Sequence, residues 1–210
     1  MQTVEDGTQY SAWMRRLALA LPIILVLNSC QSPDPTDWRT PIESQSTKMT
    51  IEDLRERAEQ NNYLAMFQLG WRYDTGTGVK QNPREAASWY RLAGEQGGLS
   101  MAQNNLGCLY RDGRGVTQDY KTASTLFRSA GLLGNRHAKT NLGWLYERGY
   151  GVAVDYPRAL KLYTEAATEV RNPNTGALDP GHAMAQNNLG CLYRDGKGTR
   201  ADPYEATRWF

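Results

Sequence analysis

The sequence is poor in the residues that hold metals or carry redox chemistry. It contains three cysteines and two histidines among 210 residues. A structural zinc site needs several Cys or His ligands at short spacings, whereas His137 and His182 stand alone. We therefore expect no metal site and no cofactor.

The sequence also lacks an excess of charge of one sign. Its 24 Lys and Arg residues face 22 Asp and Glu residues, a net charge of +2. Nucleic-acid-binding domains are usually strongly basic, so we expect no nucleic acid as a partner. Arginine exceeds lysine by 18 to 6, without an evident reason in the sequence.

Signatures of nucleophilic catalysis are missing as well. Neither Ser-x-x-Lys nor Gly-x-Ser-x-Gly occurs, and these motifs carry the nucleophile in penicillin-interacting and α/β-hydrolase enzymes. We therefore expect no catalytic residues. A hydrolase that acts on cell-wall or β-lactam substrates is kept only as an alternative.

One short apolar run is present near the N-terminus. Residues 17–27 are uninterrupted apolar residues that follow Arg15 and Arg16. Eleven residues are too few to cross a bilayer, but they fit the apolar region of a secretory signal. A buried core helix is the alternative, and Pro22 argues against it. We expect a signal peptide over 1–29, with Met14 as a candidate true start.

The signal ends in Leu27-Asn28-Ser29-Cys30, which resembles the lipobox of bacterial lipoproteins. The resemblance implies lipidation of Cys30, and Gln31 after it implies an outer-membrane lipoprotein facing the periplasm. A plain secretory signal, giving a soluble periplasmic or secreted protein, is the alternative. Residues 30–48 would form a flexible tether, because they are rich in Pro, Ser and Thr.

The rest of the chain is a tandem repeat. Leu-Gly pairs begin at 69, 106, 142 and 189, so their spacings are 37, 36 and 47. A Gly-x-Gly column and two Ala columns share these spacings, and such agreement indicates a repeat architecture. The longer interval contains an insertion over 171–181. We expect repeats over about 64–100, 101–137, 138–183 and an incomplete 184–210.

Each repeat is predicted to contain two helices. The first ends at a glycine of the Gly-x-Gly motif, which suits a helix C-terminus. The second begins at an N-cap residue: Asn82, Asp119, Asp155 or Asp202. Pro83 and Pro203 are expected at the first helical position, with Glu85 and Glu205 completing capping boxes. A recurring glycine inside the first helix, such as Gly70, suggests close approach of backbones.

A further helix is predicted upstream of the repeats. Thr50 and Asp53 have capping-box spacing and would open a helix that runs to about Gln60. We interpret residues 49–63 as a half-repeat that caps the stack.

The pattern A-x-x-x-L-G-x-x-Y-x-x-G-x-G-V resembles Sel1-like repeats, which are relatives of the tetratricopeptide repeat. The resemblance covers about residues 65–210 and implies an all-α solenoid of helix pairs that forms a right-handed superhelix. It also implies a non-catalytic adaptor or scaffold that binds protein partners, with the first helices lining a concave face.

The first helices present a second face whose residues are candidates for binding. An amide near the middle of each helix could bond an extended peptide, or it could link neighbouring helices. Tryptophans beside it could anchor a partner or fill the groove floor. The candidate residues are Gln68, Trp71, Asn104, Asn105, Arg111, Asn141, Trp144, Asn187, Asn188 and Arg194.

Residues 101–113 and 184–196 are identical, which indicates recent duplication. Cys108 and Cys191 lie at the same position of the two copies. We interpret them as small, half-buried residues, or alternatively as thiols that form intermolecular bridges in an oxidising compartment.

The function that these observations favour is an envelope adaptor. It would bind a periplasmic or envelope protein through the concave face or the open C-terminal edge at Trp209 and Phe210. An immunity protein that neutralises a secreted toxic effector is the alternative of the same class.

Overall fold

The protein was analysed as a computed structural model that describes residues 49–168, 170–171, 178–179 and 181–210. The predicted signal peptide, Cys30 and the predicted tether lie outside these residues, as does most of the insertion. Among the described residues, no helix is long and apolar enough to cross a membrane.

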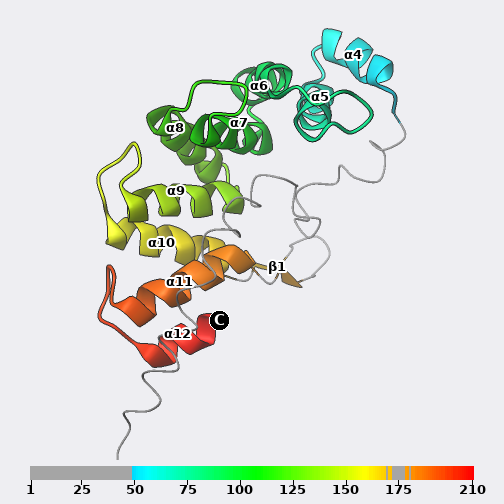
Figure 1. The fold of residues 1–210 in the computed structure, drawn as a ribbon. Coiled ribbons are helices and arrows are strands. Elements are labelled where there is room, and N and C mark those ends of the chain that lie inside the picture. The colour runs from blue at the N-terminus through cyan, green and yellow to red at the C-terminus, as the bar shows by residue number, and fades with distance from the viewer. Residues whose placement is uncertain (1–48, 169, 172–177, 180) are drawn as a thin grey trace, which may run out of the picture. The chain divides into compact units, whose positions relative to one another are not determined.

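The described chain is a succession of helices that stack in sequence order (Figure 1). Four helix pairs form repeats 1 to 4, and α4 precedes them. The helices are α4 (Ile51–Glu59), α5 (Tyr63–Thr75) with α6 (Pro83–Arg91), α7 (Ser100–Asp112) with α8 (Tyr120–Leu132), α9 (Arg136–Arg148) with α10 (Tyr156–Ala167), and α11 (Ala183–Asp195) with α12 (Pro203–Trp209). A π-helical turn, η1 (Leu92–Gln96), extends α6. The predicted α-solenoid of helix pairs is confirmed.

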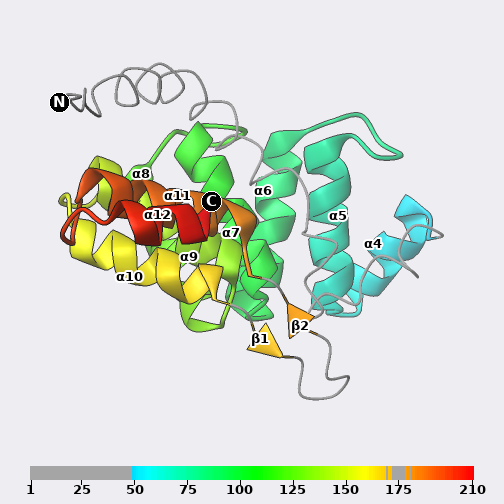
Figure 2. The ribbon, with the colours of Figure 1, turned by 90° about the horizontal axis from the view of Figure 1, so that it is seen from below.

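The insertion between repeats 3 and 4 contributes a minimal sheet. Strands β1 (Val170–Arg171) and β2 (Leu178–Asp179) pair antiparallel after the end of α10 (Figure 2). They flank the segment of the insertion that the structure leaves undescribed. The chain then returns to the helical stack at α11.

Helix ends follow the residues expected from the sequence. Asn82, Asp119, Asp155 and Asp202 cap the second helices through their side chains. The first helices end at glycines with φ between 66° and 78°: Gly76, Gly113, Gly149 and Gly196. This left-handed conformation is easily adopted only by glycine.

The predicted capping boxes are correct at α4 and wrong at α6 and α12. At α4, Thr50 and Asp53 bond each other's backbone N–H groups at 2.9 and 3.1 Å. At α6, the Asn82 N–H donates instead to the Tyr73 carbonyl of the preceding helix, at 2.8 Å. Asp202 makes the equivalent bond to Tyr193, at 2.9 Å. A backbone carbonyl of the first helix thus accepts the hydrogen bond from the N-cap N–H group. In a capping box, the glutamate side chain would accept that bond.

The recurring glycine inside the first helices makes room for an aromatic ring rather than for another backbone. A Cβ added at Gly70 would lie 2.6 Å from the Tyr90 ring of the second helix in the same repeat. The equivalent pairs are Gly107 with Phe127, Gly143 with Tyr163 and Gly190 with Phe210. The expected backbone contact at this position is therefore corrected to a ring against a glycine.

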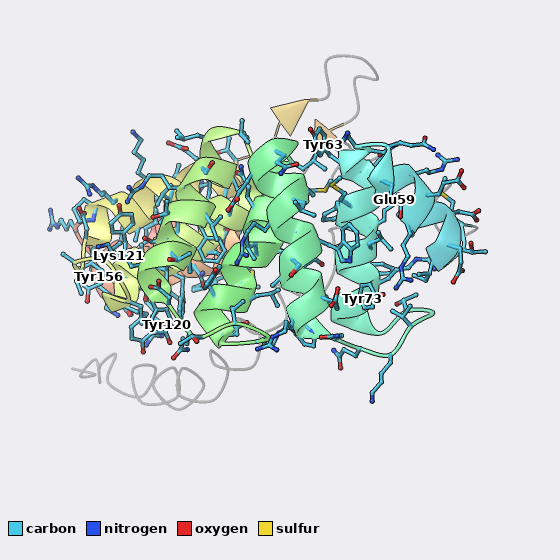
Figure 3. The ribbon with its side chains drawn as sticks, turned by 90° about the horizontal axis from the view of Figure 1, so that it is seen from above. Glu59, Tyr63, Tyr73, Tyr120, Lys121 and Tyr156 are labelled. Atoms are coloured by element: carbon cyan, nitrogen blue, oxygen red, sulfur yellow. The ribbon has the colours of Figure 1, made fainter. Side chains whose placement is uncertain are left out.

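Close backbone contact occurs at the second glycine of the Gly-x-Gly motif. A Cβ at Gly115 would lie 2.3 Å from the Pro83 carbonyl carbon in the preceding repeat. Gly151 faces the backbone of Tyr120 and Lys121 in the same way, and Gly198 faces that of Tyr156; these three residues are labelled in Figure 3. This glycine therefore joins successive repeats, while the first glycine of the motif ends a helix.

Arginines link the second helices α6 and α8 to the first helix of the next pair. Arg91 on α6 donates to the Tyr110 hydroxyl on α7 at 2.9 Å, and Arg128 on α8 donates to that of Tyr146 on α9 at 3.2 Å. Arg55 on α4 makes the same contact to Tyr73 on α5 at 2.6 Å. The contact accounts for part of the arginine excess, because a guanidinium offers five donors on a long arm.

Candidate functional site

The candidate site is the face of the first helices formed by residues at positions i, i+4 and i+7. We call it the helix-A face. It consists of three positions per repeat: Phe67, Trp71 and Asp74 on α5; Asn104, Cys108 and Arg111 on α7; Thr140, Trp144 and Glu147 on α9; and Asn187, Cys191 and Arg194 on α11. An amide column runs beside it, formed by Gln68, Asn105, Asn141 and Asn188.

The helix-A face alternates between two kinds of repeat. Repeats 1 and 3 combine Trp and a carboxylate on the first helix with Tyr on the second, as Trp144, Glu147 and Tyr163 do. Repeats 2 and 4 combine Cys and Arg with Phe, as in the set Cys108, Arg111 and Phe127. Sequence reasoning missed this alternation, although a comparison of the repeat columns would have revealed it.

A buried tyrosine hydroxyl accounts for the carboxylate in repeat 3. The Tyr163 hydroxyl donates to Glu147 Oε2 at 3.0 Å. Burial raises the pKa of Tyr163 well above its ordinary value, and the Glu147 charge raises it further. Tyr90 is likewise fully buried, and its pKa is raised by burial and by the Asp74 charge, but its hydroxyl makes no hydrogen bond of normal geometry to any described residue. Phenylalanine has no hydroxyl that needs a hydrogen-bond acceptor, so repeats 2 and 4 can carry arginine at the position of the carboxylate.

Asp74 is itself a buried carboxylate with a cationic partner. It is paired with Arg114, which lies in the loop after α7 in the next repeat. Burial raises the pKa of Asp74, and the Arg114 charge opposes that rise. The pair ties repeat 1 to repeat 2 at the edge of the helix-A face, and sequence reasoning did not identify it.

Arg111 forms the centre of a polar network between repeats 2 and 3. Its guanidinium bonds both carboxylate oxygens of Asp112, at 2.7 and 3.0 Å, and Nη1 donates to Asn141 Oδ1 at 3.1 Å. Asn141 Nδ2 in turn donates to Asn104 Oδ1 at 3.0 Å. The Arg111 guanidinium also lies over the Trp144 ring, 5.8 Å from its centroid. Cation–π geometry of this kind is favourable in partly buried sites.

The amide column lies between repeats. Asn105 faces the Tyr90 hydroxyl of the preceding repeat and lowers the pKa that burial raises; Asn188 does the same for Tyr163. Asn141 follows a repeat with Phe127 and bonds Asn104 and Arg111 instead. The column therefore makes contacts inside the stack.

The candidate residues differ in how accessible they are. Gln68, Asn104, Arg111 and Asn141 are buried, while Trp71, Trp144, Asn105 and Asn188 are half-buried. Trp144 packs edge-on against Tyr150 at a centroid distance of 5.2 Å. Among the candidates, only Asn187 and Arg194, both on α11, are exposed. Of the two described cysteines, Cys108 is buried, whereas Cys191 is a half-buried free thiol.

The two histidines meet at the junction between repeats 3 and 4. The rings of His137 and His182 pack edge to face with centroids 4.3 Å apart, and Thr140 Oγ1 lies 2.9 Å from His182 Nδ1. Within the described parts of the chain, no group of three or more His, Cys, Asp or Glu side chains is arranged to hold a metal ion. The histidines thus form part of the helix packing.

Comparison with known proteins identifies the repeats. The Sel1 repeat model matches residues 64–98, 100–135, 136–169 and 183–210. A comparison with curated proteins found no match.

Two solved structures are similar over most of this chain. One is a protective antigen of uropathogenic Escherichia coli with an SLR fold, 33% identical with a TM-score of 0.68 over 77% of this chain and 32% of its own. The other is a Sel1 repeat protein from Oxalobacter formigenes, 31% identical with a TM-score of 0.63 over 76% of this chain and 60% of its own. The chain therefore spans about a third and three fifths of these two relatives.

Sel1 repeats generally mediate protein–protein interactions and generally act as non-enzymatic scaffolds. The repeat pattern, the helix pairs and both structural relatives agree, and the chain belongs to the Sel1 repeat family.

Proposed function

We propose that this protein is a non-catalytic adaptor that binds a protein partner through the helix-A face. The observation that carries the proposal is the chemistry of that face. It includes two half-buried tryptophans and, at its α11 end, an exposed arginine, which are residue types that dominate binding energy at protein interfaces. Arg194 lies there with the exposed Asn187. The partner-binding role general to Sel1 repeats supports the same reading.

Site-specific photocrosslinking in cells tests this proposal. A photoreactive phenylalanine analogue at position 187 on α11 samples the helix-A face. The same analogue at Lys161 on α10 and at Thr125 on α8, both exposed on second helices, provides matched controls. We expect one defined protein adduct from position 187 and none of that mass from the controls. Adducts of equal yield from all three positions would contradict a role for the helix-A face.

We further propose that the adaptor is an outer-membrane lipoprotein that faces the periplasm, anchored through Cys30. The lipobox-like Leu27-Asn28-Ser29-Cys30 after an apolar run supports this location. Each buried methylene contributes about 0.8 kcal/mol to membrane binding, so more than one acyl chain gives a stable anchor. A periplasmic adaptor held in this way would meet its partner at the envelope.

Metabolic labelling with a clickable palmitate analogue tests the anchor. Wild type and Cys191→Ala should be labelled, because Cys191 lies on α11 in the repeats. Cys30→Ala should not be labelled and should leave the membrane fraction. Equal labelling of all three proteins, or of none, would remove the lipoprotein proposal without affecting the helix-A face.

A further inference from the structure

The duplicated segment places one set of side chains in two different surroundings. Residues 101–113 include all of α7 after Ser100, and the identical residues 184–196 include all of α11 after Ala183. The side chain of Arg111 is 3% exposed, whereas that of Arg194 is 44% exposed. Asn104 is buried, and its counterpart Asn187 is exposed. The same surface is thus buried in repeat 2 and exposed in repeat 4.

The α7 copy shows which chemistry this surface accepts. Helix α9 presents Asn141 and Trp144, three residues apart, to α7. Asn141 bonds both Arg111 and Asn104, at 3.1 and 3.0 Å, and the Trp144 ring lies under the Arg111 guanidinium. A single helix face that carries one amide and one indole therefore contacts two polar side chains of the duplicated segment, Arg111 and Asn104.

The α11 copy retains one of the two bonds by which the aspartate of α7 holds its arginine. Arg194 Nε donates to Asp195 Oδ1 at 2.8 Å, as Arg111 Nε does to Asp112 Oδ1 at 2.7 Å. This bond lowers the pKa of Asp195, so the carboxylate stays charged and keeps the guanidinium oriented. A guanidinium has five donors, so Arg194 retains donors for a further acceptor. Preorganisation of this kind reduces the entropy lost on binding.

We propose that the α11 part of the helix-A face binds a partner helix that presents Asn and Trp three residues apart. The partner amide bridges Asn187 and Arg194, and its indole lies against the Arg194 guanidinium, in the arrangement that α9 makes with α7. This inference rests on the proposed adaptor function and specifies the recognition chemistry of its partner.

A helical peptide copied from α9 tests the inference on the whole chain. The peptide has the sequence of residues 136–148 and is stapled through positions 143 and 147. In the protein these two positions face Tyr163 of α10, so the staple leaves Asn141 and Trp144 free. Stapling is needed because a 13-residue helix is marginal in water. Fluorescence anisotropy of a labelled peptide measures binding.

We expect saturable binding to the wild-type chain and a loss of about tenfold or more in affinity for Arg194→Ala. A charge-assisted hydrogen bond is worth about 1.5–3 kcal/mol, and about 1.4 kcal/mol is tenfold. Peptides with Asn141→Ala or Trp144→Ala should lose affinity to a similar extent. Arg200→Ala, which removes an exposed arginine from the loop before α12, is the matched control and should bind as wild type does.

Other outcomes overturn the inference. They are no saturable binding, affinity for Arg194→Ala within about twofold of wild type, or self-association of the chain that Arg194→Ala abolishes. The last result would assign the surface to a second copy. A crosslinked partner at position 187 with no peptide binding overturns only the inference, whereas peptide binding with no crosslinked partner in cells counts against the adaptor function. Circular dichroism melting of Arg194→Ala confirms that the variant is folded.

Discussion

At the scale of single residues, the molecule is distinguished by two buried tyrosines that lie over glycines. Tyr90 and Tyr163 have their hydroxyls near Asp74 and Glu147 and near the amides Asn105 and Asn188. Tyrosine is seldom fully buried without a partner for its hydroxyl. The carboxylates and amides therefore serve the packing of the repeats before they serve any ligand.

The buried tyrosines predict a loss of stability at alkaline pH. An unfolded tyrosine ionises at about pH 10, whereas burial keeps Tyr90 and Tyr163 protonated in the folded chain. Stability is therefore complete below about pH 10 and falls as pH rises above it, by about 1.4 kcal/mol per pH unit for each tyrosine. Urea titrations between pH 8 and about pH 11 measure the slope.

Replacing these tyrosines should flatten the pH dependence. We expect Tyr163→Phe to cost about 1–2 kcal/mol at neutral pH through its lost hydrogen bond and to lose less stability than wild type above pH 10. Tyr204→Phe is the control, because Tyr204 is 74% exposed. An unchanged slope in Tyr163→Phe would show that this hydroxyl ionises in the folded state.

At the scale of elements, the sequence was informative about where helices begin and end. Capping residues act within a few residues of their own position, so Asn82 or Gly76 could be interpreted locally. The capping boxes at α6 and α12 failed because the Tyr73 and Tyr193 carbonyls, which belong to a different helix, take the N-cap donors. Local patterns could not reveal that competition.

The contact between a glycine and an aromatic ring gives a prediction for the first helices. Gly107→Ala would place a Cβ 2.6 Å from the Phe127 ring, and we expect a loss of about 1–3 kcal/mol from overpacking. Gly131→Ala, within α8, is the control, because its nearest neighbour is Lys139 Cγ at 3.2 Å, a looser contact than the ring at Gly107. Alanine favours a helix over glycine by about 1 kcal/mol, so this variant should be neutral or more stable.

Thermal melting of the two variants distinguishes the explanations. A loss at Gly107 together with no loss at Gly131 supports the ring contact. Comparable losses at both positions would mean that helical glycines in this stack are sensitive to an added side chain for some other reason, and the assigned role of the Phe127 ring would be wrong.

At the scale of the whole molecule, the described repeats are joined mainly to their immediate neighbours. The joints include Gly115 against Pro83, Arg91 with Tyr110, and Asp74 with Arg114. Stability in such a stack is approximately a sum of repeat terms and nearest-neighbour terms. The repeat spacings predicted this architecture. The specific contacts between repeats join residues up to 42 positions apart in the sequence, so only the structure could reveal them.

Substitutions at the second glycine of the Gly-x-Gly motif test whether stability depends mainly on contacts between neighbouring repeats. Gly115→Ala would force a Cβ to within 2.3 Å of the Pro83 carbonyl carbon at a φ of 71°. Gly78→Ala shares the positive φ, 73°, but meets only the Arg72 side chain at 3.3 Å. The free energy of unfolding of the control, Gly78→Ala, should fall by about 1–2 kcal/mol because of the left-handed conformation. That of Gly115→Ala should fall by on the order of 2 kcal/mol more because of overpacking.

Hydrogen exchange locates the damage along the stack. In Gly115→Ala, amides of α6, α7 and α8 should exchange faster than in wild type, while those of α11 change least. Uniform acceleration through α12 would show instead that the described repeats unfold as one cooperative unit.

The alternation of the helix-A face also bears on how the repeat array changes length. The identical segments 101–113 and 184–196 lie two repeats apart, so each copy brings Arg to a repeat that has Phe at the position of the buried tyrosine. A copy shifted by one repeat would set Arg against a buried tyrosine hydroxyl and remove its carboxylate acceptor. We therefore expect a copy shifted by two repeats to preserve these pairings and a copy shifted by one repeat to disrupt them.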